Sequence, residues 1–387
     1  MKPRPNLVLV TGGTGHLGAR IIDELLKANY SVRATARPHK VDTLRKTYPG
    51  ADGKLDVVEM ADLIADAGDW PKILKGVDAV IHVACPVFHP GVTATAIYTA
   101  ANEGTQKLLD AVMDPQSSVT RFVLTGSTGV FFNPDFSSIM DDTTYDHNTY
   151  SDIESIDPEK HTPSYGYIAS KITSEKLIWK AEQKMKAEQE SKANEFPRIE
   201  FTSILPSTVY GWFLKDYPVP KTISEFNANK FLYGLIPPSD QFPSFPTYPL
   251  RTVVHNQDVA KAHVLALTAP APPDGQRRRF IVSQGMMSWV DAIEFLQQPE
   301  TITKFKARLR ELKASERTVS NGIVPRLPDV KDAMQMSKFN LDSSLTESVL
   351  GMKASDYIPW QETLLEVMPE LLAWEETHQD ALHPEPS

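Results

Sequence analysis

Hydrophobic residues in the first third of the chain come in short continuous runs separated by amphipathic stretches. The first run is Leu-Val-Leu-Val at 7–10, and further strand-like runs follow at 32–36, 55–58, 79–83 and 122–125. Continuous apolar runs of this length are typical of strands that are buried on both faces of a parallel sheet. The intervening stretches have helix length, and 19–28 carries its apolar residues at helical spacing. This alternation predicts an α/β protein with a Rossmann-type, doubly wound parallel sheet.

The pattern changes after position 131. Residues 132–163 are rich in Asp, Ser, Thr, Asn and Pro and lack apolar periodicity, so we predict a long loop there. A helix is predicted from 164 to about 192, and a sixth buried strand over 199–205. Prolines become frequent beyond Pro206, which predicts a loop-rich region built from short elements.

The composition narrows the range of functions. The chain has 387 residues, 30 prolines, one cysteine, ten histidines and a net charge of −9. Binding to nucleic acids or anionic membranes needs clustered positive charge, so neither partner is expected. One cysteine excludes an intramolecular disulfide, and the histidines lack metal-ligand spacing, so no metal is expected. Without a signal-peptide core or an apolar run of roughly 18 residues, we expect a cytoplasmic protein, monomeric or weakly homodimeric.

A glycine-rich turn joins the first strand to the first helix. Glycines allow the tight turn, the approach of a pyrophosphate to the backbone, and close packing of the helix on the strand. The start of the helix supplies N–H donors and partial positive charge. In this setting the turn predicts dinucleotide binding, with a purely structural turn as the alternative. The residues predicted to bind the cofactor here are Thr11, Gly12, Gly13, Gly15, His16, Leu17 and Gly18.

The end of the second strand indicates which dinucleotide is bound. An NAD site normally has an Asp or Glu about 20 residues after the glycines, to hold the ribose 2′-hydroxyl. This chain has no acid there and places Arg37 19 residues past Gly18, with Lys40 close behind. Arginine can bind a 2′-phosphate through two parallel hydrogen bonds. We therefore predict NADP(H) as cofactor; the alternative is that both residues are merely solvated in a loop.

A tyrosine and a lysine four residues apart supply candidate acid–base chemistry. Tyr167 and Lys171 share one face of the predicted helix. A phenol with its usual pKa near 10 transfers protons poorly at neutral pH unless a nearby cation stabilises its anion. Ser127 follows the fifth strand, at the sheet edge where open α/β sheets bind ligands. We predict that these three residues are catalytic.

These motifs together resemble an extended short-chain dehydrogenase/reductase. Within that superfamily the chain is similar to the dihydroflavonol-reductase-like and cinnamoyl-reductase-like ketone and aldehyde reductases, from about residue 7 to residue 267. The resemblance implies an NADP-binding unit over 1–206, to which segments near 251–267 return, and a mainly substrate-binding, smaller lobe over 207–387. The motif at 254–260 is largely structural in the family.

The resemblance also implies roles for further residues. Asp62 and Leu63 correspond to a pair that contacts the adenine. Residues 82–86 correspond to a segment beside the cofactor, with Cys85 in place of the usual Ser or Thr, and 206–211 to a segment that closes over the nicotinamide. Gly126 and Gly129 also depart from the usual Ser, Ala or Thr. The remaining predicted cofactor residues are Val83, Ala84, Pro206, Thr208 and Val209, and the predicted substrate residues are Cys85, Phe88, Tyr210 and Trp212.

The implied reaction is reversible hydride transfer from NADPH to a carbonyl. Tyr167 would protonate the oxygen, Ser127 would stabilise it, and Lys171 would lower the pKa of the tyrosine and hold the nicotinamide ribose. The aromatic stretch over 210–248 is interpreted as a lid or pocket wall, which favours a small hydrophobic or aromatic aldehyde or ketone. Two alternatives stay open: an NAD-dependent nucleotide-sugar epimerase or dehydratase, and a non-catalytic NADPH-sensing regulator.

Two other features receive structural interpretations. His82 and His255 stand next to predicted strand ends and are expected to support the fold. Arg277–Arg279 is interpreted as a solvated turn before a strand at 280–283, too short to indicate a nucleic-acid site.

Overall fold

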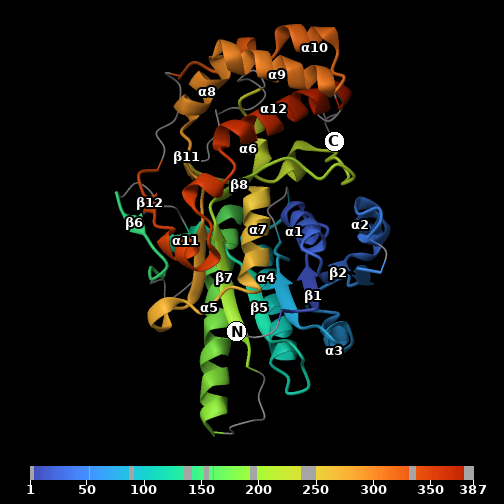
Figure 1. Ribbon diagram of the computed structural model, residues 1–387, viewed down its shortest axis with the longest axis vertical. Helices are drawn as coiled ribbons and strands as arrows, with labels where there is room; N and C mark the ends of the chain where they lie inside the picture. The colour runs from blue at the N-terminus through green and yellow to red at the C-terminus, as the bar shows by residue number, and fades with distance from the viewer. Residues whose placement is uncertain are drawn as a thin grey trace.

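A seven-stranded parallel sheet organises the molecule (Figure 1). The computed structural model describes residues 4–51, 53–86, 91–134, 142–151, 157–159, 161–191, 198–236, 250–330 and 337–378. Every neighbouring pair of strands in this sheet is parallel. From edge to edge its strands are β10 (Arg278–Val282), β7 (Glu200–Pro206), β5 (Arg121–Thr125), β4 (Ala79–His82), β1 (Leu7–Thr11), β2 (Ser31–Ala36) and β3 (Leu55–Glu59). The predicted Rossmann-type fold is confirmed. Strand order reverses between β1 and β4, where such sheets bind ligands.

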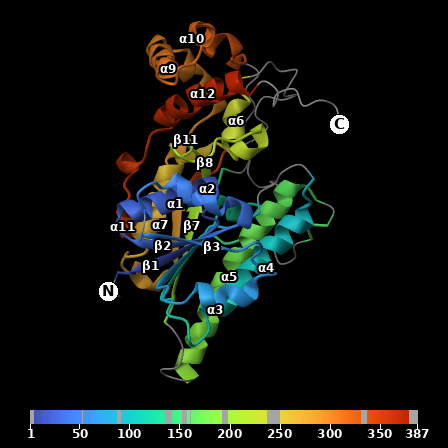
Figure 2. The same cartoon turned by 90° about the vertical axis from the view of Figure 1, so that its right-hand side faces the viewer.

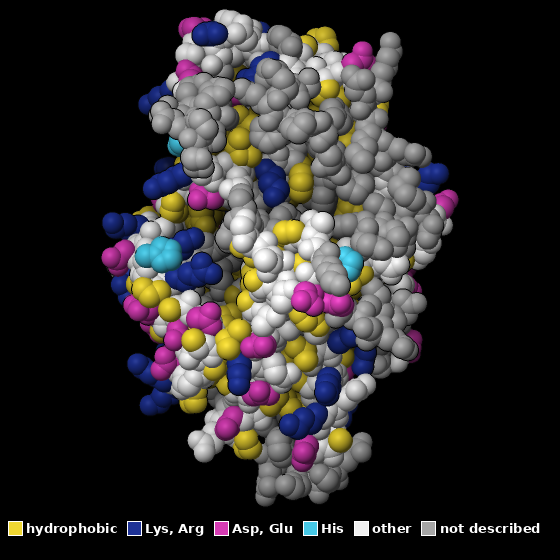
Figure 3. Space-filling model, turned by 180° about the vertical axis from the view of Figure 1, so that it is seen from behind, with side chains coloured by type: hydrophobic (Ala, Val, Ile, Leu, Met, Phe, Trp, Pro, Cys, Tyr) yellow, Lys and Arg dark blue, Asp and Glu magenta, His cyan; other side chains and the backbone are white. Residues whose placement is uncertain are grey.

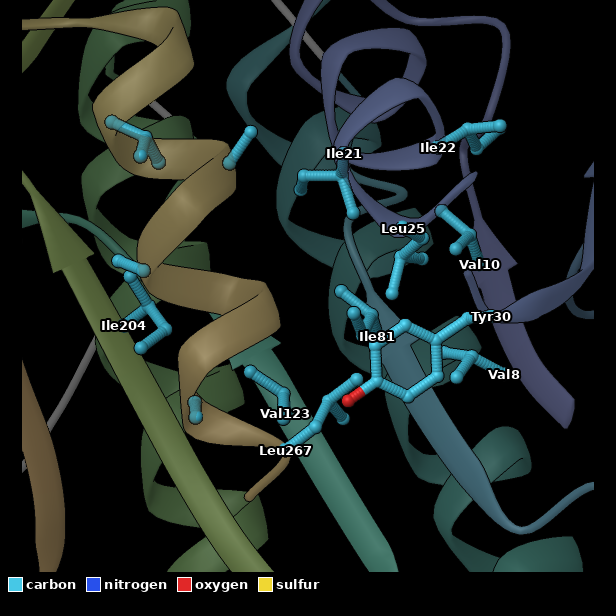
Figure 4. Close-up of a cluster of buried hydrophobic side chains, with 14 of the residues drawn as sticks. Val8, Val10, Ile21, Ile22, Leu25, Tyr30, Ile81, Val123, Ile204 and Leu267 are labelled. Carbon is cyan, nitrogen blue, oxygen red and sulfur yellow. The ribbon is translucent and has the colours of Figure 1, made fainter. Parts of the chain in front are cut away.

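Helices cover both faces of the sheet, as Figure 2 shows edge-on. One face carries α1 (His16–Lys27), α2 (Val41–Thr47), α7 (Asn256–Ala266) and α11 (Ser344–Leu350). The other face carries α3 (Trp70–Ile73), α4 (Ala94–Val112) and α5 (Pro163–Ser191). Figure 4 shows the first of the two cores, in which Ile21 and Leu25 of α1 meet Val8 and Val10 of β1. The apolar residues that the sequence places at helical spacing in the first helix therefore pack that helix against the sheet.

A smaller lobe lies beyond the carboxyl ends of the strands, at the top of Figure 1. Its helices are α6 (Asn229–Tyr233), α8 (Trp289–Gln297), α9 (Pro299–Glu311), α10 (Glu316–Asn321) and α12 (Trp360–Thr377). A three-stranded sheet joins it to the larger unit through β11 (Gly285–Met286), β9 (Thr252–His255) and β8 (Thr208–Tyr210). A two-stranded sheet pairs β12 (Asn340–Leu341) with β6 (Thr144–Tyr145). The chain returns to the main sheet through α7 and then through β10, so the late sequence contributes to both units.

Short 3₁₀ helices connect several of these elements. They are η1 (Pro38–Lys40), η2 (Ala67–Asp69), η3 (Thr128–Phe131), η4 (Ile223–Phe226), η5 (Pro273–Gly275), η6 (Val324–Arg326) and η8 (Ala354–Asp356). Of these, η1 follows β2 and η3 follows β5, so both begin where a strand of the main sheet ends. The predicted loop over 132–163 contains β6; its residues 135–141, 152–156 and 160 lie outside the described part of the chain.

The prediction of a solvated turn at Arg277–Arg279 is wrong for two of the three residues. Arg278 and Arg279 belong to β10 and are only 9% and 0% exposed. Arg278 donates to carbonyls at and just beyond the end of α7, and Arg279 forms an ion pair with Glu175. Buried arginines are rare unless they are paired. Glu175, the partner of Arg279, is 104 residues away, so the local pattern carried no sign of that burial.

The described exterior mixes charges of both signs. On the face in Figure 3, basic and acidic side chains are interspersed with hydrophobic and uncharged ones. Within the described ranges, no helix combines the length and the apolar character needed to cross a bilayer.

Candidate functional site

The glycine-rich turn fits closely against the end of β4. Gly12 has a φ of +70°, which favours glycine, and a Cβ added there would lie 2.8 Å from the main chain of Ala84. A Cβ on Gly18 would lie 2.1 Å from the carbonyl oxygen of Gly12. Gly15 precedes α1, and among the described residues no side chain caps that helix. The turn thus presents backbone and a helix N-terminus, which together suit a phosphate.

A buried histidine fixes the turn to β4. His82 Nε2 lies 3.0 Å from Thr105 Oγ1, whose hydroxyl donates to a carbonyl of α4, so Nε2 carries the proton. His82 Nδ1 then accepts from Thr11 Oγ1 at 2.7 Å, and Thr11 Oγ1 accepts the N–H of Ala84 at 3.2 Å. Burial, with the positive charge of Lys171, lowers the pKa of His82 to about 3. The imidazole is therefore neutral and serves as a brace, the structural role predicted for it.

The side chain of His16 faces the smaller lobe. Its Nε2 lies 2.9 Å from the carbonyl oxygen of Gly211 and 2.8 Å from Asn256 Nδ2, and its ring packs 4.6 Å from that of Phe213. Burial and the charge of Arg20 are the main causes that lower the pKa of His16 to about 4. At neutral pH the imidazole of His16 is therefore uncharged, and it connects the larger unit to the smaller lobe. Its backbone lies at the first position of α1.

Sequence reasoning missed this connection between the glycine-rich turn and the segment after β8. Tyr217 donates to the carbonyl oxygen of Thr14 at 2.5 Å, and Arg20 donates to that of Trp212 at 3.1 Å. Asn256 also donates to the Trp212 carbonyl, at 2.9 Å. The sequence predicted His16 as a cofactor-binding residue of the turn. Its side-chain partners lie about 200 residues away, so no local signal indicated this connection.

The residues predicted to select the cofactor lie at the ends of β2 and β3. Arg37 directly precedes η1 and is exposed, as is Lys40. Asp62 accepts the N–H groups of Ala65 and Ile64, and these bonds, together with the charge of Arg37, lower its pKa despite some burial. Leu63 is half-buried against α4, close to Gly104. The structure thus brings a guanidinium and a carboxylate together beside the reversal point of the sheet.

The three predicted catalytic residues meet at the end of β5. Ser127 directly precedes η3 and caps it, and Tyr167 and Lys171 lie one turn apart on α5. The hydroxyls of Ser127 and Tyr167 are hydrogen-bonded to each other. Because Ser127 Oγ also accepts the N–H of Gly129 at 3.0 Å, its own proton is available to a second oxygen. Lys171 Nζ lies 5.6 Å from the centre of the Tyr167 ring and donates to the Thr125 carbonyl at 2.9 Å.

Burial dominates the electrostatics of Tyr167. It raises the pKa of the phenol well above 10, nearby Cys85 adds to the rise, and the hydrogen bond from Ser127 opposes it. The phenol is therefore protonated at neutral pH, and burial makes it a weaker acid than an exposed tyrosine. The predicted lowering of this pKa by Lys171 is not among the effects that the structure shows, and stays a prediction.

A third neutral histidine supports the strand that Lys171 contacts. His263 Nδ1 donates to the Val259 carbonyl at 2.8 Å, so its Nε2 accepts the hydroxyl of Thr125, also at 2.8 Å. Burial lowers the pKa of His263 to about 4. His263 thus holds the side chain of Thr125, while the carbonyl oxygen of Thr125 accepts the hydrogen bond from Lys171.

The residues predicted to contact substrate are less closely gathered. Cys85 is half-buried near Tyr167, whereas Tyr210 is 1% exposed within the hydrophobic core of the smaller lobe. Trp212 is half-buried against Phe213. Phe88 and residues 237–249 lie outside the described part. Of the other predicted residues, Pro206 ends β7, Val83 and Ala84 follow β4, and Thr208 and Val209 lie in β8.

Much of the aromatic stretch packs into the core instead of forming a pocket wall. Phe226 and Tyr233 are fully buried and contact Trp374 of α12 edge-on. His255 also has a structural place, since its Nε2 lies 2.6 Å from Glu366 Oε2, also of α12. Among the described residues, no group of three or more His, Cys, Asp or Glu side chains is arranged to hold a metal.

Comparison with known proteins places this site in a family. The chain is 30% identical over 299 residues to an uncharacterized oxidoreductase of Schizosaccharomyces pombe, covering 76% of this chain and 82% of the relative. It is 27% identical over 319 residues to dihydroflavonol 4-reductase of Solanum lycopersicum, covering 80% and 74%. Its fold matches yeast methylglyoxal/isovaleraldehyde reductase Gre2 complexed with NADPH, with a TM-score of 0.73 at 22% identity, covering 95% and 99%. These matches confirm the resemblance to extended short-chain dehydrogenases/reductases.

The match to a family sequence model extends over the glycine-rich turn, the Ser–Tyr–Lys cluster and the last strand of the sheet. It covers residues 8–280. The chain therefore belongs to the NAD dependent epimerase/dehydratase family.

Proposed function

We propose that the protein is an NADPH-dependent reductase that reduces the carbonyl of a hydrophobic or aromatic aldehyde or ketone, and reversibly oxidises the alcohol. The observation that carries the proposal is the meeting of Ser127, Tyr167 and Lys171 at the end of β5. Reductases are also prominent among the relatives. Cytoplasmic action on a small molecule, by a monomer or weak homodimer, completes the proposal.

The residues present fit a dinucleotide with a 2′-phosphate. Gly12 and Gly18 stand where any Cβ would collide with backbone, so the turn is shaped for close approach. Arg37 and Lys40 would hold the 2′-phosphate, and Lys171 would hold the nicotinamide ribose. When bound, NADPH supplies the hydride for the carbonyl carbon.

The chain's own residues manage the proton. The phenol of Tyr167 is protonated at neutral pH, and its Oη would donate to the carbonyl oxygen as negative charge develops there. Because burial raises the pKa of Tyr167, this transfer needs a group that stabilises the phenolate. Ser127 Oγ accepts from Gly129 and can therefore direct its proton to the same oxygen. Lys171, fixed by the Thr125 carbonyl, places a positive charge beside the ring of Tyr167. Its charge would stabilise the phenolate left after proton transfer.

A carbonyl screen of the wild type and one variant tests the proposal. NADPH oxidation is followed with aldehydes, diketones and aromatic ketones, and Tyr167→Phe is expected to lower kcat by about 10²–10⁴-fold while NADPH affinity changes little. Retention of most of kcat would remove Tyr167 from the acid role. Bound NAD that survives gel filtration would favour the epimerase, and NADPH binding without any turnover would favour the sensor.

Cofactor choice is tested at Arg37. Arg37→Asp is expected to shift the ratio of kcat/KM for NADPH over NADH by at least about tenfold toward NADH, since a carboxylate repels a 2′-phosphate and accepts from a 2′-hydroxyl. Arg45→Asp is the matched control, because Arg45 is an exposed arginine of α2 that pairs with Asp42. Equal ratios in both variants would refute the assignment of Arg37.

A further inference from the structure

An ion pair between strand β10 and the catalytic helix is fully buried. Arg279 Nε and one terminal nitrogen each donate to a different oxygen of Glu175, both at 2.9 Å. Their side chains are only 1% and 4% exposed. Two parallel hydrogen bonds define direction as well as distance, because both groups are planar. The pair therefore holds α5 in one orientation against the edge strand.

The same guanidinium also holds the segment between β6 and α5. Its remaining terminal nitrogen donates to the carbonyl oxygens of Thr149 and, at 3.3 Å, His147. The guanidinium carbon lies 4.3 Å from the centre of the Tyr150 ring. Hydrogen bonds to carbonyls in the ring plane and an aromatic ring against the face are both favourable for arginine.

A third contact reaches residues 127–131, the Ser127 loop, which consists of Ser127 and η3. The guanidinium carbon lies 5.0 Å from the centre of the Phe131 ring, at the end of η3. Phe131 in turn stacks on Tyr145 of β6 at 5.3 Å with ring planes 3° apart. Glu175 lies four residues after Lys171 and eight after Tyr167, on the same face of α5. One side chain thus contacts the elements that carry all three residues of the proposed catalytic cluster.

We infer that Arg279 is a positioning residue for carbonyl reduction, which it serves by fixing the Ser127 loop and α5 in mutual register. This inference rests on the proposed function. Stability alone does not require the pair, since replacing a buried ion pair with packed apolar groups is often neutral or stabilising. The placement of the reacting groups does require the pair, because a shift of about 1 Å in a reacting group can lower the rate by about 10²-fold.

The neighbouring arginine provides a matched control. Arg278 precedes Arg279 in β10, is also buried, and points to the opposite face of the sheet, where it donates to carbonyls near the end of α7. Arg279→Lys keeps the charge and loses the paired bonds; Arg278→Lys makes the same change on the other face. We expect Arg279→Lys to lower kcat by about 10–100-fold with KM for NADPH within about twofold. Arg278→Lys is expected to leave kcat within about twofold.

A double-mutant cycle separates positioning from general damage. In a Ser127→Ala background, Arg279→Lys is expected to lower kcat by less than about threefold, since the group that it positions is gone. Additive losses, or equal kcat values for the two lysine variants, would overturn the inference. If Arg279→Lys fails to fold, Glu175→Met/Arg279→Met removes both charges; a folded double variant with wild-type kcat overturns the inference, and one with lowered kcat and normal KM supports it. Absence of NADPH oxidation by the wild type with every carbonyl would instead overturn the proposed function, and the positioning role with it.

Discussion

Acid should destabilise this protein in part through two of the histidines that are buried without charge. His82 and His263 are 2% and 0% exposed, and burial lowers their pKa values to about 3 and about 4. In the unfolded chain each has a pKa near 6.5. A depressed pKa in the folded state means that the unfolded chain binds more protons below pH 6.5. The resulting stability is complete above that pH and is lost as the pH falls below it.

The size of the effect follows from the unfolded state. At pH 5.5, protonation lowers the free energy of the unfolded chain by about 1.4 kcal/mol for each imidazole with a pKa of 6.5. The folded imidazole stays neutral at this pH, so the free energy of the folded state hardly changes. The two residues together therefore remove about 3 kcal/mol between pH 7.5 and 5.5. That is a large part of the ~5–15 kcal/mol that a typical protein has in total.

Urea unfolding at pH 7.5 and 5.5 measures this loss. Wild type, His263→Gln and His82→Gln should all lose stability from pH 7.5 to pH 5.5. In each variant the loss in the free energy of unfolding should be about 1.4 kcal/mol smaller than in wild type, because glutamine does not titrate. Carboxylates contribute equally to all three proteins, so they cancel from the comparison. Between pH 7.5 and 8.5 the variants and wild type should change alike. The reasoning is refuted if both variants lose as much stability at pH 5.5 as wild type does.

Three further substitutions have definite expected results. Gly18→Ala should abolish NADPH binding in a fluorescence titration or prevent folding, because its Cβ would lie 2.1 Å from the Gly12 carbonyl oxygen; near-normal affinity would contradict that geometry. Trp70→Ala should lower the free energy of unfolding by about 3–5 kcal/mol, since the side chain is fully buried, and a loss below 1 kcal/mol would contradict its packing. Tyr217→Phe should cost about 1 kcal/mol in urea unfolding by removing the bond to Thr14, and an unchanged midpoint would contradict that bond.

Local sequence signals were sufficient to predict the sheet and the meeting of Ser127, Tyr167 and Lys171 at the end of β5. Continuous apolar runs identify strands because parallel strands are buried on both faces, and each run predicted over the first 205 residues is a strand in the structure. The glycine-rich turn and the spacing of Tyr167 and Lys171 are equally local. Their convergence with Ser127 follows because neighbouring parallel strands end at one edge.

Local sequence signals did not predict contacts between residues that lie far apart in the sequence. Arg279 and Glu175 are 104 residues apart, and His16 and Asn256 are 240 apart. A charged or polar residue carries no local sign of the partner that will compensate for its burial, so the sequence predicted a solvated Arg279 and a cofactor-binding His16. Phe226 and Tyr233, which the sequence assigned to a lid or pocket wall, are instead buried against α12, and α12 comes more than 100 residues later.

The position of β10 at the edge of the main sheet has a consequence for biosynthesis. A ribosome that has completed β7 at residue 206 must add 76 more residues before β10 is finished at 282. At about 5–20 residues per second this takes about 4–15 s. Throughout that interval β7 is an edge strand with unpaired backbone groups, the kind of surface that other chains can pair with. The nascent chain is therefore most exposed to aggregation after its cofactor-binding motifs have been made and before its last parallel strand arrives.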